Sequence, residues 1–133
     1  MFGALDISTS GLIAQRIQLD AIAGNIANAR TTRRADGLPG PYLRRVALLS
    51  AGNGRDGAGV QVTGVLEDTL TKPRLVHDPG HPDADPGGYV HYPNVDLSTE
   101  MINAMVAARA YEANVTAIEA AKSMVASTLR LLA

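Results

Sequence analysis

The chain has 133 residues, of which 46% are hydrophobic and 19% are charged, a composition typical of one small folded domain. It contains no cysteine, which excludes disulfide frameworks, thiolate zinc sites and cysteine nucleophiles. The formal net charge of −1 gives no reason to expect a nucleic acid or an anionic membrane as a partner.

The first residues do not read as a secretory signal peptide, because Arg16 is the first basic residue and Asp6 interrupts the apolar stretch before it. Apolar runs such as 46–49 and 105–108 are far shorter than the roughly 20 residues that a membrane-spanning helix needs. We therefore expect no membrane span, and any export should use a route other than a cleavable signal peptide.

Glycine and proline divide the chain into three segments. All seven prolines and ten of the thirteen glycines lie between Gly37 and Pro93. Because these residues break regular structure, the pattern predicts a helix in 1–32, a β or irregular middle in 33–96, and a helix in 97–133. The expected fold class is mainly α with a small β or irregular middle.

The N-terminal helix is expected from about Ala4 to Ala29. Its apolar residues recur every seven positions, which is typical of a helix that packs along another helix. Gly11 and Gly24 weaken it by about 1 kcal/mol each relative to alanine. The stripe consists of Leu5, Leu12, Leu19 and Ile26, with Ile22 beside it.

Five of the twelve basic residues follow this helix within a short stretch. A nucleic-acid surface would need interleaved aromatic residues or a recognised motif, and Tyr42 alone is weak support. We expect ion pairs with a neighbouring subunit, or a solvated face. The residues are Arg30, Arg33, Arg34, Arg44 and Arg45.

Two strands are predicted next, Tyr42–Leu49 and Val60–Leu66, joined by a glycine-rich loop at 52–59. Three glycines of this loop match the dinucleotide fingerprint G-x-G-x-x-G, which requires a helix immediately afterwards. A strand-like alternation follows instead, so a hairpin loop is the favoured interpretation. The glycines are Gly52, Gly54 and Gly57.

An extended, turn-rich stretch is expected over Pro73–Pro93, and it carries the only ligand-rich cluster of the chain. Histidine and carboxylate groups can bind zinc. However, the prolines among them prevent the helix that would place His77 and His81 on one face, and Asp-Pro and glycine-rich spacing is typical of turns. The cluster is His77, Asp78, His81, Asp83, Asp85 and His91.

The C-terminal helix gives the strongest pattern in the chain, a 3.5-residue repeat over five heptads. Asp96 or Ser98 can cap its start, and the acids Glu100, Glu112 and Glu119 lie off the apolar seams, where they are expected to face solvent or other subunits. We expect this long helix to pack on other chains as well as on the N-terminal helix. The first seam is Leu97, Ala104, Tyr111, Ile118, Val125 and Leu132, and the second is Met101, Ala108, Val115, Lys122 and Leu129.

No nucleophile elbow or other catalytic constellation is present. The sequence predicts a protein that is not an enzyme and that has no catalytic residues, cofactor, metal or small-molecule substrate.

Two stretches resemble the flagellar axial proteins, which form the rod and hook. One is Ser10–Arg16 followed by Asn25–Thr32, and the other is Gly88–Asp96 followed by Glu100-Met101 and Arg109–Val115. Among that family, Tyr92-Pro93 and the 78–84 segment point to the short subunits of the proximal rod. The motif residues are Asn25, Ala27, Asn28, Tyr92, Pro93, Asn94, Val95, Asp96, Glu100, Arg109, Tyr111, Glu112 and Asn114.

The resemblance implies a structural subunit of the basal-body rod in the periplasm. It would be exported by the flagellar type III apparatus, with its terminal helices paired as an antiparallel coiled coil in a helical tube that transmits torque and conducts export. Partners would be other copies, other rod proteins and the export-gate or ring-adjacent proteins. Asn25, Asn28, Asn94, Asp96 and Glu100 would satisfy backbone groups at helix ends and turns.

The predicted assembly interface follows the apolar seams of both helices. It comprises Leu5, Leu12, Leu19, Ile22, Ile26, Leu97, Met101, Ala104, Ala108, Tyr111, Val115, Ile118, Val125, Leu129 and Leu132. Three alternatives stay open at this point: another rod subunit of the same family, a small His/Asp metal-binding module, and a cytoplasmic coiled-coil adaptor.

Overall fold

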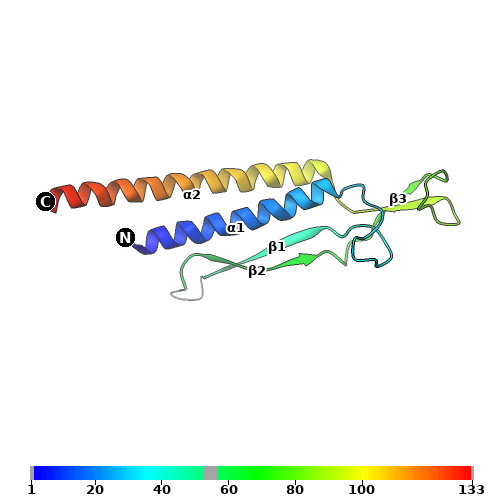
Figure 1. Ribbon diagram of the computed structural model, residues 1–133, viewed down its shortest axis with the longest axis horizontal. Helices are drawn as coiled ribbons and strands as arrows, with labels where there is room; N and C mark the ends of the chain where they lie inside the picture. Colours follow the sequence, from blue (N-terminus) through cyan, green and yellow to red (C-terminus); the bar gives the residue numbers. More distant parts are fainter. Residues whose placement is uncertain (1, 53–56, 133) are drawn as a thin grey trace.

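The computed structural model describes residues 2–52 and 57–132. Two long helices lie side by side in an elongated molecule, and the strands at 45–51 and 60–67 lie alongside the N-terminal helix. The strands at 74–77 and 89–92 extend beyond the helices, at the end opposite the chain termini (Figure 1). The element order is α1 (Phe2–Ala27), β1 (Arg45–Ala51), β2 (Val60–Glu67), β3 (Arg74–His77), β4 (Tyr89–Tyr92) and α2 (Leu97–Leu132). This confirms the predicted mainly α fold with a β middle.

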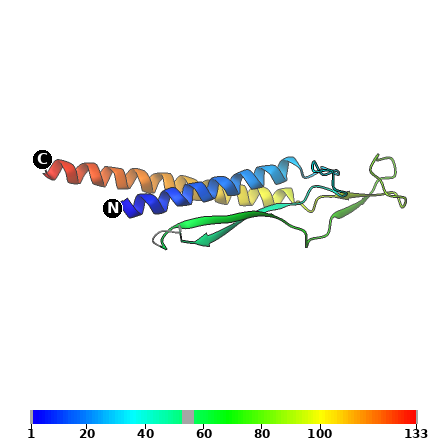
Figure 2. The same ribbon diagram turned by 60° about the horizontal axis from the view of Figure 1, so that its bottom comes forward.

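The helices run antiparallel along each other (Figure 2). α2 has 36 residues and α1 has 26, so their lengths are about 54 Å and about 39 Å at 1.5 Å per residue. The C-terminal turns of α2 therefore extend past the start of α1, as both views show. Within the described residues, neither helix is long and apolar enough to cross a membrane.

The β1–β2 hairpin covers the side of α1 that faces away from α2 (Figure 1). Its antiparallel register pairs Arg45 with Glu67 and Ala51 with Val60, with an irregularity between Leu48 and Leu49. The predicted hairpin is confirmed, although its first strand begins at Arg45 rather than Tyr42. The part of its loop at 53–56, including Gly54 of the G-x-G-x-x-G match, lies outside the described residues.

The extended, turn-rich stretch expected over 73–93 contains a second antiparallel hairpin, formed by β3 and β4, that the sequence analysis did not predict. Two features of the sequence make this hairpin. The Asp85 carboxylate accepts hydrogen bonds from the backbone N–H groups of Gly87 and Tyr89, which shapes the turn. Val90, which has no exposed surface, anchors β4, whose other residues are tyrosine and histidine.

The buried core is thin and rich in alanine. Small side chains allow the two helix backbones to approach closely, but they bury little apolar area. Fold stability must therefore depend strongly on the few larger contacts. The buried hydrophobic residues of the described chain are Ala14, Ala21, Ile22, Ala29, Val90, Val95, Ala107 and Ala121.

Candidate functional site

A buried polar cluster lies where the end of α1, the start of β1 and the first turn of α2 meet. We call Asn25, Tyr42, Arg44, Arg45 and Glu100 the junction cluster. Asn25 is fully buried and Glu100 is 1% exposed. Because unpaired polar groups are costly in such a position, each must find a partner within the chain.

Glu100 receives two donors. Arg44 Nε donates to its Oε1 at 2.7 Å, and Asn25 Nδ2 donates to its Oε2 at 3.1 Å. The expectation that Glu100 faces solvent or another subunit was therefore wrong. Counting apolar heptad positions cannot detect a buried acid whose partner, Arg44, lies 56 residues away in the sequence.

The Asn25 side-chain amide pairs with the backbone of Arg45 in the way that a residue of a neighbouring strand would. Its Oδ1 accepts from the Arg45 N–H at 2.7 Å, and its Nδ2 donates to the Arg45 carbonyl at 2.8 Å. The Tyr42 hydroxyl donates to the same Oδ1 at 3.1 Å, and burial raises the pKa of Tyr42. The junction cluster thus joins α1, α2 and the first hairpin at one point.

The other motif residues at helix ends have simpler roles. Asp96 caps α2, since its carboxylate accepts from the Ser98 N–H at 3.1 Å and from the Thr99 hydroxyl at 2.7 Å. Both bonds hold the pKa of Asp96 below its usual value, the Thr99 bond more strongly. Asn28 Nδ2 donates to the Gly24 carbonyl at 2.9 Å, in the last turn of α1.

The arginine-rich stretch makes ion pairs within the chain that the sequence did not predict, while Arg30, Arg33 and Arg45 remain exposed, as expected of a solvated face. Arg33 Nε donates to Asp83 at 2.6 Å, and Arg34 forms ion pairs with Asp36 and Glu67. Arg44 pairs with Glu100 and Arg45 with Glu67. These contacts form because folding brings acids from 67–100 next to the 33–45 segment, a placement that charge counting along the sequence does not reveal.

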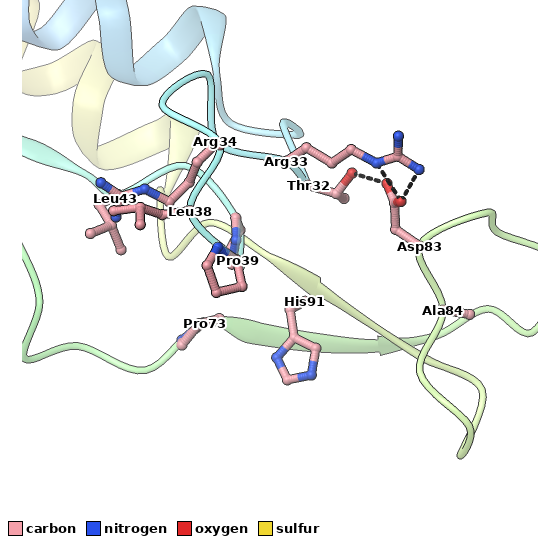
Figure 3. A pocket seen from close by; sticks show the side chains of 13 residues that line it. Thr32, Arg33, Arg34, Leu38, Pro39, Leu43, Pro73, Asp83, Ala84 and His91 are labelled. Atoms are coloured by element: carbon pink, nitrogen blue, oxygen red, sulfur yellow. Dashed lines mark hydrogen bonds and ion pairs between the residues drawn. The ribbon is translucent and has the colours of Figure 1, made fainter.

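An open depression of about 750 Å³ lies between the 32–43 loop and the β3–β4 hairpin (Figure 3). The Arg33 guanidinium and the Thr32 hydroxyl both point at the Asp83 carboxylate across one edge, and they hold its pKa below the usual range. Leu38, Pro39 and His91 line much of the rest. This depression holds no nucleophile beside a general base.

The three histidines of the 77–91 stretch do not come together around one point. His77 packs edge-on against Tyr89 with ring centroids 5.0 Å apart, and His81 Nδ1 accepts from the Asp83 N–H at 3.1 Å. His91 lies 3.9 Å from Asp85. Over residues 2–52 and 57–132, no group of three or more His, Asp or Glu side chains is arranged to hold a metal ion.

The predicted interface residues divide into two groups on the isolated chain. Ile22 is buried, and Leu5, Leu12, Leu19, Ile26, Ala104, Ala108, Val115, Ile118 and Val125 are part-buried, while Leu97, Met101, Tyr111 and Leu129 are exposed. The side chain of Leu132 lies outside the description. The structure also exposes apolar residues that the heptad seams omit, namely Ile102, Met105, Val106, Met124 and Leu131.

These exposed residues form two patches on α2. The start patch is Met101, Ile102, Met105 and Val106, and the end patch is Met124, Leu129 and Leu131. The polar residues Arg109, Glu112, Thr116 and Glu119 lie on the exposed surface between them. Met105 and Val106 adjoin two alanines in the apolar run 105–108, which was the sequence signal for the start patch.

Known proteins account for both ends of the chain. Residues 5–33 match the family described as flagella basal body rod protein, and residues 87–131 match the C-terminal region of the flagellar basal body rod FlgEFG proteins. The chain is 40% identical to the flagellar basal-body rod protein FlgC of Salmonella typhimurium over 131 residues, covering 98% of this chain and 97% of that protein.

Two further FlgC proteins match over nearly their whole length. Identity is 38% to that of Bacillus subtilis, with 98% of this chain and 97% of the relative covered, and 38% to that of Borreliella burgdorferi, with 99% and 97% covered. Both relatives are named as flagellar basal-body rod proteins, which supports the prediction of a structural subunit that is not an enzyme. The family matches at both ends and the nearly full-length matches to its members together place this chain in the FlgC family of flagellar basal-body rod proteins.

Proposed function

We propose that the chain is a subunit of the proximal rod that polymerises through its terminal helices into a helical, torque-transmitting and export-conducting tube. Membership of the family makes the chain a structural subunit of the flagellar basal-body rod. What supports the finer proposal is a single observation, the exposed apolar surface of α2.

The start patch and the end patch together expose seven large apolar side chains on one helix, with Met105 68% and Leu129 61% exposed. Burying apolar surface stabilises an assembly by about 25 cal/mol per Å². Large exposed apolar side chains gathered on one helix in this way mark surfaces that another protein covers. A neighbouring subunit would cover them in a polymer built by repeated, non-closing contacts.

The length difference between the helices adds to this argument. Because Asn25 bonds Glu100 and both helices rise about 1.5 Å per residue, the start of α1 at Phe2 lies level with about residue 123 of α2. The end patch therefore has no helix of its own chain alongside it, where α2 continues past α1 (Figures 1 and 2). A single helix in water is marginal without such packing. We infer that a helix of an adjacent subunit lies against these turns.

In this proposal the three segments have different positions in the rod. Residues 1–32 and 97–133 form the inner wall as a coiled-coil-like antiparallel pair, and residues 33–96 lie outside it, where they contact adjacent subunits. The fifteen seam residues predicted from the sequence remain the proposed assembly interface. The two patches add Ile102, Met105, Val106, Met124 and Leu131 to it.

Assembly with other basal-body rod components follows from the family. We further propose that the chain reaches the periplasm through the flagellar type III apparatus. There it would contact the export-gate or ring-adjacent proteins at the base of the rod.

The test is an in-frame deletion of the gene, followed by electron microscopy of cells and isolated basal bodies. Cells with a membrane ring but without rod, hook and filament are expected, because every distal part is exported through the proximal rod. Intact flagella in the deletion strain would contradict the proposal.

Complementation sharpens this test at the level of residues. Val125→Asp would place an unpaired charge in the proposed interface and should leave cells non-motile although the chain is produced and exported. Thr116→Asp, on the polar surface between the patches, is the matched control and should restore motility. Full motility with Val125→Asp would contradict the interface.

A further inference from the structure

The helical pair has a repeat that does not by itself define one alignment. The apolar stripe of α1 consists of Leu5, Leu12, Leu19 and Ile26, so a shift by seven residues places leucine on leucine. The buried residues between the helices are mostly alanine, which fits many neighbours equally well. Repeats of this kind allow slipped registers unless something else excludes them.

Two contacts mark the observed register, and they agree. Asn25 hydrogen-bonds Glu100 at one end of the pair. Towards the other end, a Cβ atom placed on Gly11 would lie 2.8 Å from Asn114 Nδ2, so these residues are in close contact. Gly11 lies 14 residues before Asn25, and Asn114 lies 14 residues after Glu100. The two contacts are therefore two heptads apart on both helices.

A line of facing positions follows from this spacing. The line on α2 is Glu100, Ala107, Asn114 and Ala121, all at least part-buried, and the line on α1 is Asn25, Gln18, Gly11 and Ala4. Along this line the same offset places Gln18 level with Ala107 and Gly11 with Asn114, so a long side chain meets a small one at both places, and Ala4 and Ala121 are both small. At the junction cluster two polar groups bond each other instead.

We propose that the junction cluster and the Gly11–Asn114 contact together fix the register of α1 on α2. A slip of one heptad in either direction separates Asn25 from Glu100, both of which are buried. One of the two slips also sets Asn114 against Gln18, and either slip takes Asn114 away from the glycine that admits it. The Asn25–Glu100 contact selects the native register through a hydrogen bond. The Gly11–Asn114 contact selects it sterically, because only glycine leaves room for the asparagine side chain.

The junction cluster disfavours a slipped register through the polar groups that the slip would leave without partners. A buried polar pair adds little net stability compared with apolar packing, but a slipped state that leaves Glu100 buried and unpaired is strongly disfavoured. The best-attested use of a buried polar group in paired helices is to select one alignment. Arg44, which reaches Glu100 from just before β1, extends the same selection to the first hairpin.

The chain allows a direct test because it has no cysteine of its own. Nitroxide labels attached at Asp20→Cys and Glu119→Cys, both exposed positions, report the register as a distance by pulsed electron paramagnetic resonance. In the observed register these sites are offset by 14 residues, about 21 Å along the helix axis. Dilution with unlabelled protein removes distances between chains.

The parent chain should give one distance population. The variant Arg44→Met, Glu100→Met and Asn114→Ala replaces the ion pair with apolar side chains of similar size and removes the steric marker. It should stay helical by circular dichroism and give a further population, displaced by about 10 Å along the axis for each heptad of slip. The matched control, Arg109→Met with Glu112→Met, alters an exposed ion pair of the same residue types and should keep the single population.

A single, unshifted distance in the triple variant would overturn the proposal, because apolar packing alone would then set the register. If the triple variant is not helical, Glu100→Gln with Asn114→Ala decides instead, since it removes the charge at nearly constant volume. A second population in this milder variant supports the proposal, and a single unshifted distance overturns it.

Discussion

The two ends of the helical pair are built on different principles. At the junction end, α1, α2 and β1 meet around Asn25 and Glu100, and every polar group there has a partner in the same chain. At the other end, α2 continues past α1 and exposes Met124, Leu129 and Leu131. The same helix therefore has one end whose polar groups are satisfied within the chain and another end whose apolar side chains remain exposed.

Glu100→Ala should have the largest effect, because it removes the carboxylate at the centre of the junction cluster. It leaves Arg44 without its acceptor and the buried Asn25 Nδ2 with the Arg45 carbonyl alone, and we expect a loss of about 3 kcal/mol in the free energy of unfolding. Glu112→Ala, which removes an exposed carboxylate from the same helix, should cost no more than about 0.5 kcal/mol. Urea unfolding of both variants measures the difference, and equal losses would show that the junction is not special.

Gly11→Ala tests the closeness of the helices between the two ends. Alanine favours a helix over glycine by about 1 kcal/mol, but here its Cβ would push against Asn114. We expect Gly11→Ala to give no gain in the parent chain and to stabilise the Asn114→Ala variant by about 1 kcal/mol. A double-mutant cycle of thermal unfolding measures this coupling. Equal effects in the two backgrounds would contradict the close contact.

Asp96→Ala sharpens the account of how the junction end begins. Loss of this cap should cost about 1 kcal/mol in urea unfolding, because the Ser98 N–H and the Thr99 hydroxyl lose their acceptor. Ser98→Ala removes the other capping candidate predicted from the sequence, an exposed residue, and should be nearly neutral. A larger loss in the free energy of unfolding for Ser98→Ala than for Asp96→Ala would show that Ser98, and not Asp96, caps the helix.

The smallest effect concerns pH at the outer hairpin. Arg33 and Thr32 hold the pKa of Asp83 below its usual value in the folded chain. The contact therefore stabilises the fold above the unfolded carboxyl pKa of about 3.9, and this contribution is lost as pH falls through the folded pKa. The NMR signal of the Arg33 Nε–H, which donates to Asp83, should shift on acidification.

In Asp83→Asn that acid-dependent shift should be absent, whereas Asp78→Asn, in the same turn, should retain it. An unchanged titration in Asp83→Asn would show that the Arg33–Asp83 contact does not hold the hairpin.

The sequence predicted the local structure well because periodicity and chain breakers report it directly. The C-terminal helix was placed at Leu97–Leu132, as observed, and the first hairpin was found from its alternation and glycines. The contacts between distant segments were not predictable in this way. Glu100 pairs with Arg44, 56 residues away, and Arg33 pairs with Asp83, 50 residues away. Neither pair therefore produces a local pattern in the sequence. The β3–β4 hairpin was missed because its prolines and glycines obscured two four-residue strands.

The central claim is that the junction end is complete in the single chain whereas the end patch is completed only by neighbours. Hydrogen–deuterium exchange on the isolated chain and on isolated rods tests this most directly. We predict strong protection around Asn25 and Glu100 in both samples, and protection of residues 124–132 only in the rods. Strong protection of 124–132 in the isolated chain, or none there in the rods, would contradict the claim.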